Sequence, residues 1–249
     1  MGPIVVEKPR IVLPTQRSEV DDHWFSQKTG VIGPPGIGKS EFFSHGDKTL
    51  YIQTEAGLNH LRVMKVPVRS WDDFREVYTQ LLQASPFPYD TIVIDTIDKF
   101  VDLANQEAME RGRQKFKNIE INTVGDIPNG AGWAWATDLV ENALGKLEEL
   151  PAHIIFIGHL EMKEVKLPTS SIHKLTISIG GRTGSMLMAW CDHILNIQAV
   201  SQGTKSTRTI KTIPTSTLEA KSRGGMVLDG WVWSEVSADN YTKFRSFFK

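Results

Sequence analysis

The chain has 249 residues and a formal net charge of −1 at pH 7, so it can hold one α/β domain with a substantial core, and two domains would be cramped. Because the net charge is close to zero, the overall charge does not predict nucleic-acid binding. A nucleic-acid site would have to be a local basic patch or be formed by assembly of several copies. A single cysteine, Cys191, excludes an internal disulfide framework, and the histidines show no metal-ligand spacing that would predict a zinc site.

The compartment and the domain layout follow from the same composition. No segment approaches the roughly 18 apolar residues of a membrane span, so we expect no membrane association. The charged Glu7, Lys8 and Arg10 stand where a signal peptide would need its apolar core, and one cysteine is compatible with a reducing cytoplasm. We interpret residues 1–28 as an N-terminal arm or edge strand and residues 29–249 as one domain.

Short apolar runs alternate with longer mixed segments, which is typical of β-α units around a parallel sheet. Helical spacing of apolar residues predicts helices over Trp71–Gln83 and Trp133–Leu150, with their tryptophans as core residues. Residues 193–213 alternate as a β-hairpin does. The expected fold class is α/β, with a mainly parallel central sheet flanked by helices and a C-terminal antiparallel β extension. The expected strands are Thr29–Ile32, Thr49–Gln53, Thr91–Asp95, His153–Gly158, His193–Ala199 and Thr207–Ile213.

A glycine-rich loop follows the first expected strand and indicates nucleotide binding. Gly33 to Ser40 spell G-x-x-x-x-G-K-[ST], the P-loop, between a β-prone run and a short helix. In this motif, the backbone N–H groups surround a phosphate, the lysine meets the outer phosphates and the hydroxyl ligates Mg²⁺. The predicted nucleotide-binding residues are Gly33, Pro34, Pro35, Gly36, Ile37, Gly38, Lys39, Ser40 and Glu41.

Three acidic or polar side chains follow later strands, at the sheet edge where α/β proteins bind ligands. Asp95 ends an apolar strand and can hold Mg²⁺ opposite Ser40; the plainer interpretation is an exposed turn aspartate. Glu55 can orient and deprotonate water, or can be a solvated helix-capping residue. His159 can sense the γ-phosphate and pass its state to the following loop, or can be a structural histidine.

The order of these motifs resembles the RecA-type ATPases. More closely, it is similar to the small phage-encoded RecA-like proteins of single-strand annealing and recombination, often called AAA-family proteins. The closer likeness is carried by Thr54–Leu58, by Asp126–Trp133 and by Glu219–Arg223, and it covers about residues 29–230. The resemblance implies a RecA-like P-loop NTPase core with ATP and Mg²⁺ as cofactors.

The resemblance also implies catalytic roles. Glu55 matches the general base, and Lys221 and Arg223 match basic residues that reach the nucleotide of a neighbouring subunit, which would make hydrolysis depend on assembly. The plainer interpretation of Lys221–Arg223 is a solvated basic turn. The full catalytic set is Glu55, Lys39, Lys221, Arg223 and His159.

Family members bind single-stranded DNA through mobile loops inside a ring or filament, and two polar stretches, Arg111–Gly132 and Lys163–Gly184, look mobile here. Cations together with aromatic stacking are the usual means of such binding, although a charge run is more often a solvated face. The candidate DNA-binding residues are Arg111, Arg113, Lys115, Lys117, Lys163, Lys166, Lys174 and Arg182. The implied partners are single-stranded DNA, further copies of the chain and a single-strand-binding protein.

We therefore expect a Mg²⁺-dependent ATPase, stimulated by single-stranded DNA, that acts in recombination, annealing or replication of a phage in the host cytoplasm. The first alternative is a nucleotide-gated DNA-binding scaffold with little turnover. The second is a P-loop kinase of a small molecule, with Arg111-Gly112-Arg113 as its basic lid. No guanine-reading N-K-x-D string is present, so a signalling GTPase is not supported. The chain is much shorter than full-length RecA, which puts complete strand exchange in doubt.

Overall fold

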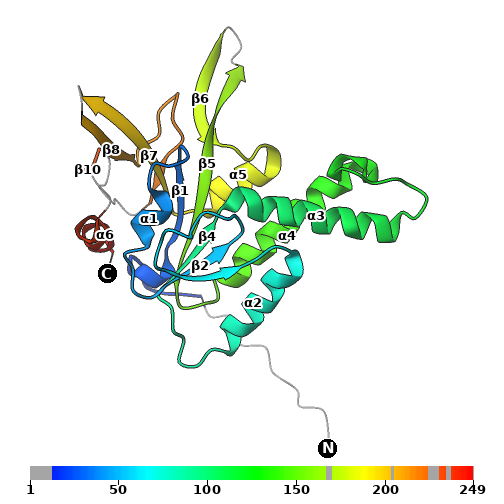
Figure 1. The fold of residues 1–249 in the computed structure, drawn as a ribbon, viewed down its shortest axis with the longest axis horizontal. Coiled ribbons are helices and arrows are strands. Elements are labelled where there is room, and N and C mark those ends of the chain that lie inside the picture. Colours follow the sequence, from blue (N-terminus) through cyan, green and yellow to red (C-terminus); the bar gives the residue numbers. More distant parts are fainter. Residues whose placement is uncertain (1–12, 167–169, 203–204, 224–229, 234–236, 249) are drawn as a thin grey trace, which may run out of the picture.

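A computed structural model describes residues 13–166, 170–202, 205–223, 230–233 and 237–248 of the chain (Figure 1). The helices are α1 (Lys39–Phe43), α2 (Trp71–Gln83), α3 (Ile97–Lys115), α4 (Ala131–Leu147), α5 (Gly181–Trp190) and α6 (Ala238–Arg245). Short 3-10 turns are η1 (Trp24–Ser26), η2 (Val124–Asp126) and η3 (Pro128–Gly130). The strands are β1 (Lys28–Gly33), β2 (Thr49–Gln53), β3 (Met64–Pro67), β4 (Thr91–Asp95), β5 (His153–Lys166), β6 (Ser171–Ile177), β7 (His193–Gln202), β8 (Lys205–Lys211), β9 (Lys221–Ser222) and β10 (Val232–Trp233).

The strands form one mixed sheet in the order β10-β8-β7-β1-β5-β4-β2-β3, with β6 added on β5 and β9 on β7. The six strands from β7 to β3 pair in parallel, whereas β8 and β10 extend the sheet with antiparallel pairing. This arrangement confirms the expected α/β fold with a mainly parallel sheet and an antiparallel extension. Parallel strands buried on both faces are continuous apolar runs, which explains why these segments could be found in the sequence.

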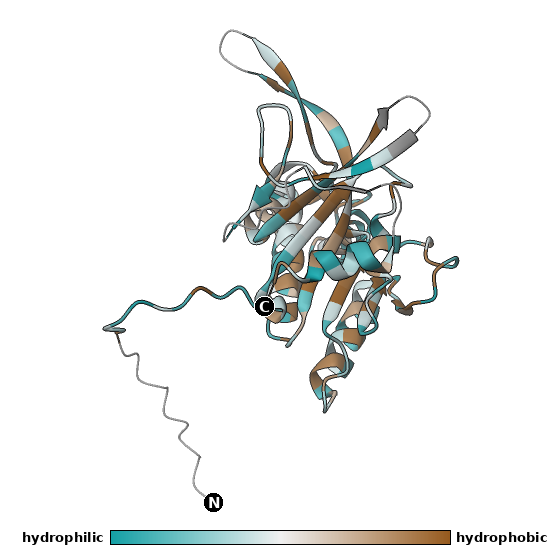
Figure 2. Cartoon of the chain, turned by 90° about the vertical axis from the view of Figure 1, so that its left-hand side faces the viewer, coloured by the Kyte–Doolittle hydropathy of each residue, from teal (hydrophilic) through white to brown (hydrophobic). Residues whose placement is uncertain are grey.

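Helices cover both faces of the sheet (Figure 1). On one face, α2, α3, α4 and α5 pack over residues such as Ile94 and Phe156. On the other, Phe42 and Phe43 of α1 and Phe244 of α6 pack over Val93 and neighbouring strand residues. Figure 2 shows the apolar strands running through the middle of the molecule between these layers.

Three expected elements, α2, β2 and β4, have the predicted bounds because their local signals are strong. Helix α2 begins after Ser70, whose side chain accepts from the Asp73 N–H while the Asp73 carboxylate accepts from the Ser70 N–H, a capping box. Its apolar face is buried through Trp71, Phe74 and Leu81. Strand β2 likewise covers Thr49–Gln53 as expected.

Parts of the two segments expected to be mobile, Arg111–Gly132 and Lys163–Gly184, belong to helices and strands. Arg111, Arg113 and Lys115 belong to the last turns of α3, a helix that we did not predict. Strand β5 does not end at Gly158 but continues to Lys166 and pairs with β6 in a hairpin. At the charged end of α3 and in the outer part of the hairpin, the apolar pattern weakens at the edge of the core, whereas backbone hydrogen bonding continues beyond it.

The tryptophans of α4 are also different from the prediction. Trp71 of α2 is buried, but Trp133 at the start of α4 is 58% exposed, so it is not a core residue. Trp135 lies between these cases, packed against the core and stacked on Phe116 at 6.4 Å. Helical spacing predicted the helix correctly, but it could not show which side chains of its first turn pack against the core.

Residues 13–21 are exposed, among them Leu13 and Val20 at 82% and 75%, while Trp24 is buried under α6. The apolar cluster Ile4–Val6 of the expected arm lies outside the described residues. Across the described ranges, no helix has the length and apolar character needed to cross a bilayer.

Candidate nucleotide-binding site

Sheet topology brings the expected site residues together. β5 lies between the P-loop strand β1 and β4, with Gly33 opposite His159 and Asp95 opposite Ile157. Because these strands are parallel, their carboxyl ends meet at one edge of the sheet, which is where α/β folds bind ligands. The P-loop, Asp95 and His159 therefore lie side by side although they are distant in the sequence.

Two glycines of the P-loop have left-handed backbone conformations, and its lysine is buried. Gly36 and Gly38 have φ values of 72° and 94°, in the left-handed region that glycine enters without steric cost. Lys39 is 6% exposed, and its ammonium donates to the carbonyl oxygens of Gly33 and Pro34 at 2.8 and 2.9 Å. Burial lowers the pKa of Lys39, and the nearby carboxylate of Asp95 opposes this shift.

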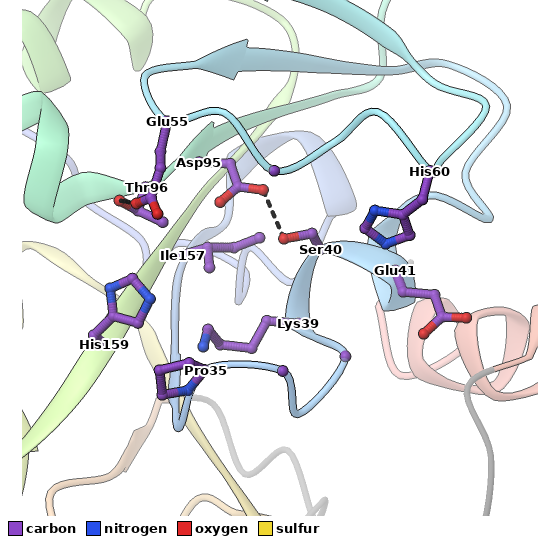
Figure 3. Close-up of a pocket in the computed structure, with 13 residues that line it drawn as sticks. Pro35, Lys39, Ser40, Glu41, Glu55, His60, Asp95, Thr96, Ile157 and His159 are labelled. Atoms are coloured by element: carbon purple, nitrogen blue, oxygen red, sulfur yellow. Dashed lines mark hydrogen bonds between the residues drawn. The ribbon is translucent and has the colours of Figure 1, made fainter.

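Ser40 and Asp95 meet as a pair of oxygen donors. The Ser40 hydroxyl donates to Asp95 Oδ2 at 2.6 Å (Figure 3). Burial raises the pKa of Asp95, while the Ser40 hydrogen bond and the Lys39 charge oppose the rise. In the described part of the chain, no cluster of three or more His, Cys, Asp or Glu could hold a metal unaided. The pair fits Mg²⁺, which usually takes one or two protein oxygens and completes its shell with substrate phosphates and water.

Glu55 lies on the loop after β2, beside the end of β4. Its backbone N–H donates to the Asp95 carbonyl at 3.3 Å, and its carboxylate accepts from the Thr96 hydroxyl at 3.2 Å. Both contacts hold the side chain at the wall of the pocket (Figure 3). The structure therefore places Glu55 in the same pocket as the P-loop and Asp95.

These residues line one cavity of about 300 Å³. From the predicted set it is lined by Pro35, Gly36, Gly38, Lys39, Ser40, Glu41, Glu55, Asp95 and His159. It is also lined by His60 and Thr96, which sequence reasoning did not single out. Figure 3 shows His60 beside Glu41, on the opposite side of the pocket from His159. A lone histidine in a loop carries no sequence signal, so only the fold could reveal it.

His159 is linked to a second cavity through Asp98, at the start of α3. The Asp98 carboxylate accepts from the His159 backbone N–H at 3.1 Å and lies 3.3 Å from its ring Nδ1. The same carboxylate accepts from the Ser178 hydroxyl. Asp98 and Ser178 also line a neighbouring cavity of about 580 Å³ that includes Trp133 and Arg182. Asp98 thus lines the second cavity and is hydrogen-bonded to His159, which lines the first.

Lys221 and Arg223 lie at the other end of the sheet from the chain's own P-loop. Lys221 belongs to β9 and Arg223 follows it directly, and β9 pairs with the amino end of β7. The Lys221 ammonium donates to carbonyls at the carboxyl end of α5, including that of Met188 at 3.0 Å, and burial lowers its pKa. Arg223 pairs with Asp192 at 3.0 Å. Neither residue can serve its own pocket in this arrangement.

Most of the candidate DNA-binding cations already have protein partners. Arg111 pairs with Glu107, and Arg113 donates to the Ile121 carbonyl. Lys115 lies over the rings of Phe116 and Trp135. In the β5–β6 hairpin and at α5, ion pairs join Lys163 to Glu161, Lys174 to Glu219 and Arg182 to Asp138. Lys117 follows α3, and Lys166 is exposed at the end of β5.

The segment Arg111-Gly112-Arg113 is not a lid over the donor phosphates. It is helical, and Gly112 is buried against Ile121 and Ile127, where a Cβ would come within 2.9 Å of both side chains. This packing gives no support to the small-molecule kinase interpretation.

The fold and the pocket define a P-loop nucleotide-binding domain. The sequence profile of the family described as AAA domain matches residues 26–224, most of the chain. The chain therefore belongs to the AAA domain family and carries an AAA-type, P-loop ATPase-like domain. No match was found among the curated proteins.

Proposed function

We propose that this protein is a Mg²⁺-dependent ATPase that acts on single-stranded DNA in recombination, annealing or replication. The observation that carries the hydrolytic part is the convergence of Lys39, Ser40, Asp95 and Glu55 on one pocket at the carboxyl edge of the sheet. These are the groups that phosphoryl transfer to water requires: a phosphate cradle, a metal site and a group that activates water.

Each side chain has a separate task. Lys39 and the P-loop amides hold the β- and γ-phosphates, and on nucleotide binding the lysine exchanges the carbonyls of Gly33 and Pro34 for phosphate oxygens. Mg²⁺, held by Ser40 and Asp95, would neutralise charge on the phosphates. Glu55 accepts a proton from the attacking water, in a position fixed by its contact with Thr96.

The DNA part of the proposal rests on the second cavity. Trp133 offers an exposed ring, and Arg182 a cation, beside the Gly180-Gly181 turn that begins α5. Aromatic rings on which bases stack, combined with cations that meet the backbone, are the usual means of binding single strands without sequence preference. Because Asp98 contacts both this cavity's wall and His159, occupancy of one cavity can influence the other.

The test measures ATP binding and phosphate release by the full chain with Mg²⁺, with and without a single-stranded oligonucleotide. We expect turnover that rises with DNA, and a Lys39→Ala variant that loses ATP binding. ATP binding and DNA binding without phosphate release would contradict the ATPase and support a nucleotide-gated scaffold. Turnover that DNA does not change would contradict the DNA part alone.

A further inference from the structure

Arg208 connects the antiparallel extension of the sheet to the P-loop. It lies on β8, whose neighbour β7 pairs with the P-loop strand β1. Its Nε–H donates to the carbonyl oxygen of Ile37 at 2.7 Å, across 171 positions of sequence. The side chain is half-buried, so it is held against the loop rather than extended into solvent. No sequence motif singled out this residue.

The carbonyl of Ile37, which Arg208 contacts, lies within the P-loop. It stands between Gly36 and Gly38, the two P-loop glycines with positive φ. The next amide, that of Gly38, belongs to the same peptide plane as the Ile37 carbonyl, and Gly38 lines the nucleotide pocket. In a trans peptide the C=O and the following N–H point in opposite directions. A donor that fixes the Ile37 carbonyl therefore also fixes the direction of the Gly38 N–H.

We propose that Arg208 is a positioning residue for nucleotide binding, which holds the Ile37–Gly38 peptide with its N–H turned toward the phosphates. Gly36 precedes this peptide and Gly38 is its second residue. Glycine has the widest choice of backbone conformations, so without a tether the loop must become ordered when the nucleotide binds. A loop that is already ordered improves affinity because binding then does not have to supply the conformational entropy cost of ordering it. The antiparallel extension thus contributes to the site although it supplies no phosphate ligand. This inference rests on the proposed nucleotide binding at the P-loop.

Two uncharged substitutions separate positioning from charge. Gln places its amide nitrogen at the same distance along the side chain as the arginine Nε, so Arg208→Gln keeps a donor and removes the charge. Arg208→Met has similar length and neither donor nor charge. As a control, Thr207→Ala removes a side-chain hydrogen bond to the Val200 carbonyl in the same hairpin without touching the P-loop.

The measurement is the Kd of Mg²⁺-ATP for each variant of the full chain, with the melting temperature of the nucleotide-free protein recorded beside it. We expect Arg208→Met to bind about 10- to 100-fold more weakly than wild type, as for loss of a hydrogen bond from a charged group. Arg208→Gln should recover about 3- to 10-fold of this loss. Thr207→Ala should bind like wild type.

Three results would overturn the inference. Wild-type affinity in Arg208→Met would show that the contact does not matter for binding. Equal weakening in Arg208→Gln and Arg208→Met would show that the charge acts and the Ile37 contact does not. A loss of affinity in Thr207→Ala as large as in Arg208→Met would assign the effect to the hairpin as a whole. Absence of ATP binding by wild type would instead contradict the proposed function itself.

Discussion

The hydroxyl of Ser40 and the carboxylate of Asp95 are joined by a 2.6 Å hydrogen bond across 55 positions of sequence. The contact exists because β5 separates β1 from β4 while the carboxyl ends of all three strands stay at one edge. It brings together two oxygen atoms that could act as ligands for Mg²⁺, one from the start of α1 and one from the end of β4.

Asp95→Asn should weaken Mg²⁺ binding at the site while it preserves the side-chain shape and an acceptor for the Ser40 hydroxyl. We expect the Mg²⁺ concentration that supports half-maximal phosphate release to rise about 10- to 100-fold, the range for groups that orient or indirectly bind a metal. A magnesium titration of the ATPase rate measures this. Asp72→Asn, a change at an exposed carboxylate of α2, is the control and should behave as wild type. An unchanged magnesium requirement in Asp95→Asn would remove Asp95 from the metal site.

Glu55→Gln should separate binding from turnover. The amide keeps an acceptor for the Thr96 hydroxyl but cannot take a proton from water, so we expect the kcat to fall about 10²- to 10⁴-fold. The Kd for ATP should stay within a few-fold of wild type. Single-turnover phosphate release and equilibrium ATP binding are the two measurements. Normal hydrolysis by this variant would exclude Glu55 as the base.

Trp133→Ala should weaken binding of a single-stranded oligonucleotide without unfolding the chain, because the ring is 58% exposed. Stacking of one base on an aromatic ring contributes about 1–3 kcal/mol. Fluorescence anisotropy with a labelled oligothymidine measures the loss, and Trp133→Phe, which keeps a stacking ring, should retain most of the affinity. If the Ala and Phe variants bind equally well, the exposed ring is not a stacking platform.

A mixture of two inactive variants tests whether Arg223 serves a neighbouring subunit. Lys39→Ala has a damaged pocket and an intact Arg223, while Arg223→Ala has the reverse. An arginine supplied to the transition state contributes about 10³- to 10⁵-fold in rate, so each variant alone should be nearly inactive. If Arg223 acts on the nucleotide of a neighbouring subunit, mixing the two variants should restore phosphate release. Size-exclusion chromatography with ATPγS and an oligonucleotide should then show an assembly. No recovery, or a monomer under every condition, would contradict the assembly part of the proposal.

Two buried histidines at the amino edge of the sheet should make stability depend on pH. Burial lowers the pKa of His193 from 6.5 to about 4 and that of His153 well below its ordinary value. The unfolded chain then takes up protons at a higher pH than the folded one, so acidification favours unfolding. For His193, stability is fully present above pH 6.5 and is lost as the pH falls toward 4.

The expected loss from His193 is up to about 3 kcal/mol over that interval, at about 1.4 kcal/mol per pH unit. Urea unfolding at a series of pH values measures it. His193→Gln removes the titration and keeps a donor for the Gln27 side chain, which His193 contacts at 2.9 Å. The variant should show a shallower pH dependence than wild type. An identical slope would mean that His193 does not carry the effect.

Some elements could be predicted because their signals are local. Strands such as Thr91–Asp95 are buried on both faces and therefore read as unbroken apolar runs, and the helix Trp71–Gln83 carries both a cap and a periodic apolar face. Helix α3 has apolar residues at helical spacing, among them Ile97 and Ala104, but its charged end was interpreted as a loop. The outer part of β5, from Glu161 to Lys166, is mostly exposed, and no apolar pattern marks it as a strand.

By itself, the sequence determined the chemical identity of the phosphate site. Gly33 to Ser40 must form a cradle because of the glycines, the lysine and the hydroxyl they contain, and Asp95 must end a strand because the apolar run stops there. The contacts among distant segments were decided only by the tertiary structure. Pairing of Ser40 with Asp95, the link from His159 through Asp98, the exposure of Trp133 and the hold of Arg208 on Ile37 depend on strand order and helix packing. Such contacts join residues whose separation in the chain carries no periodic or local signal.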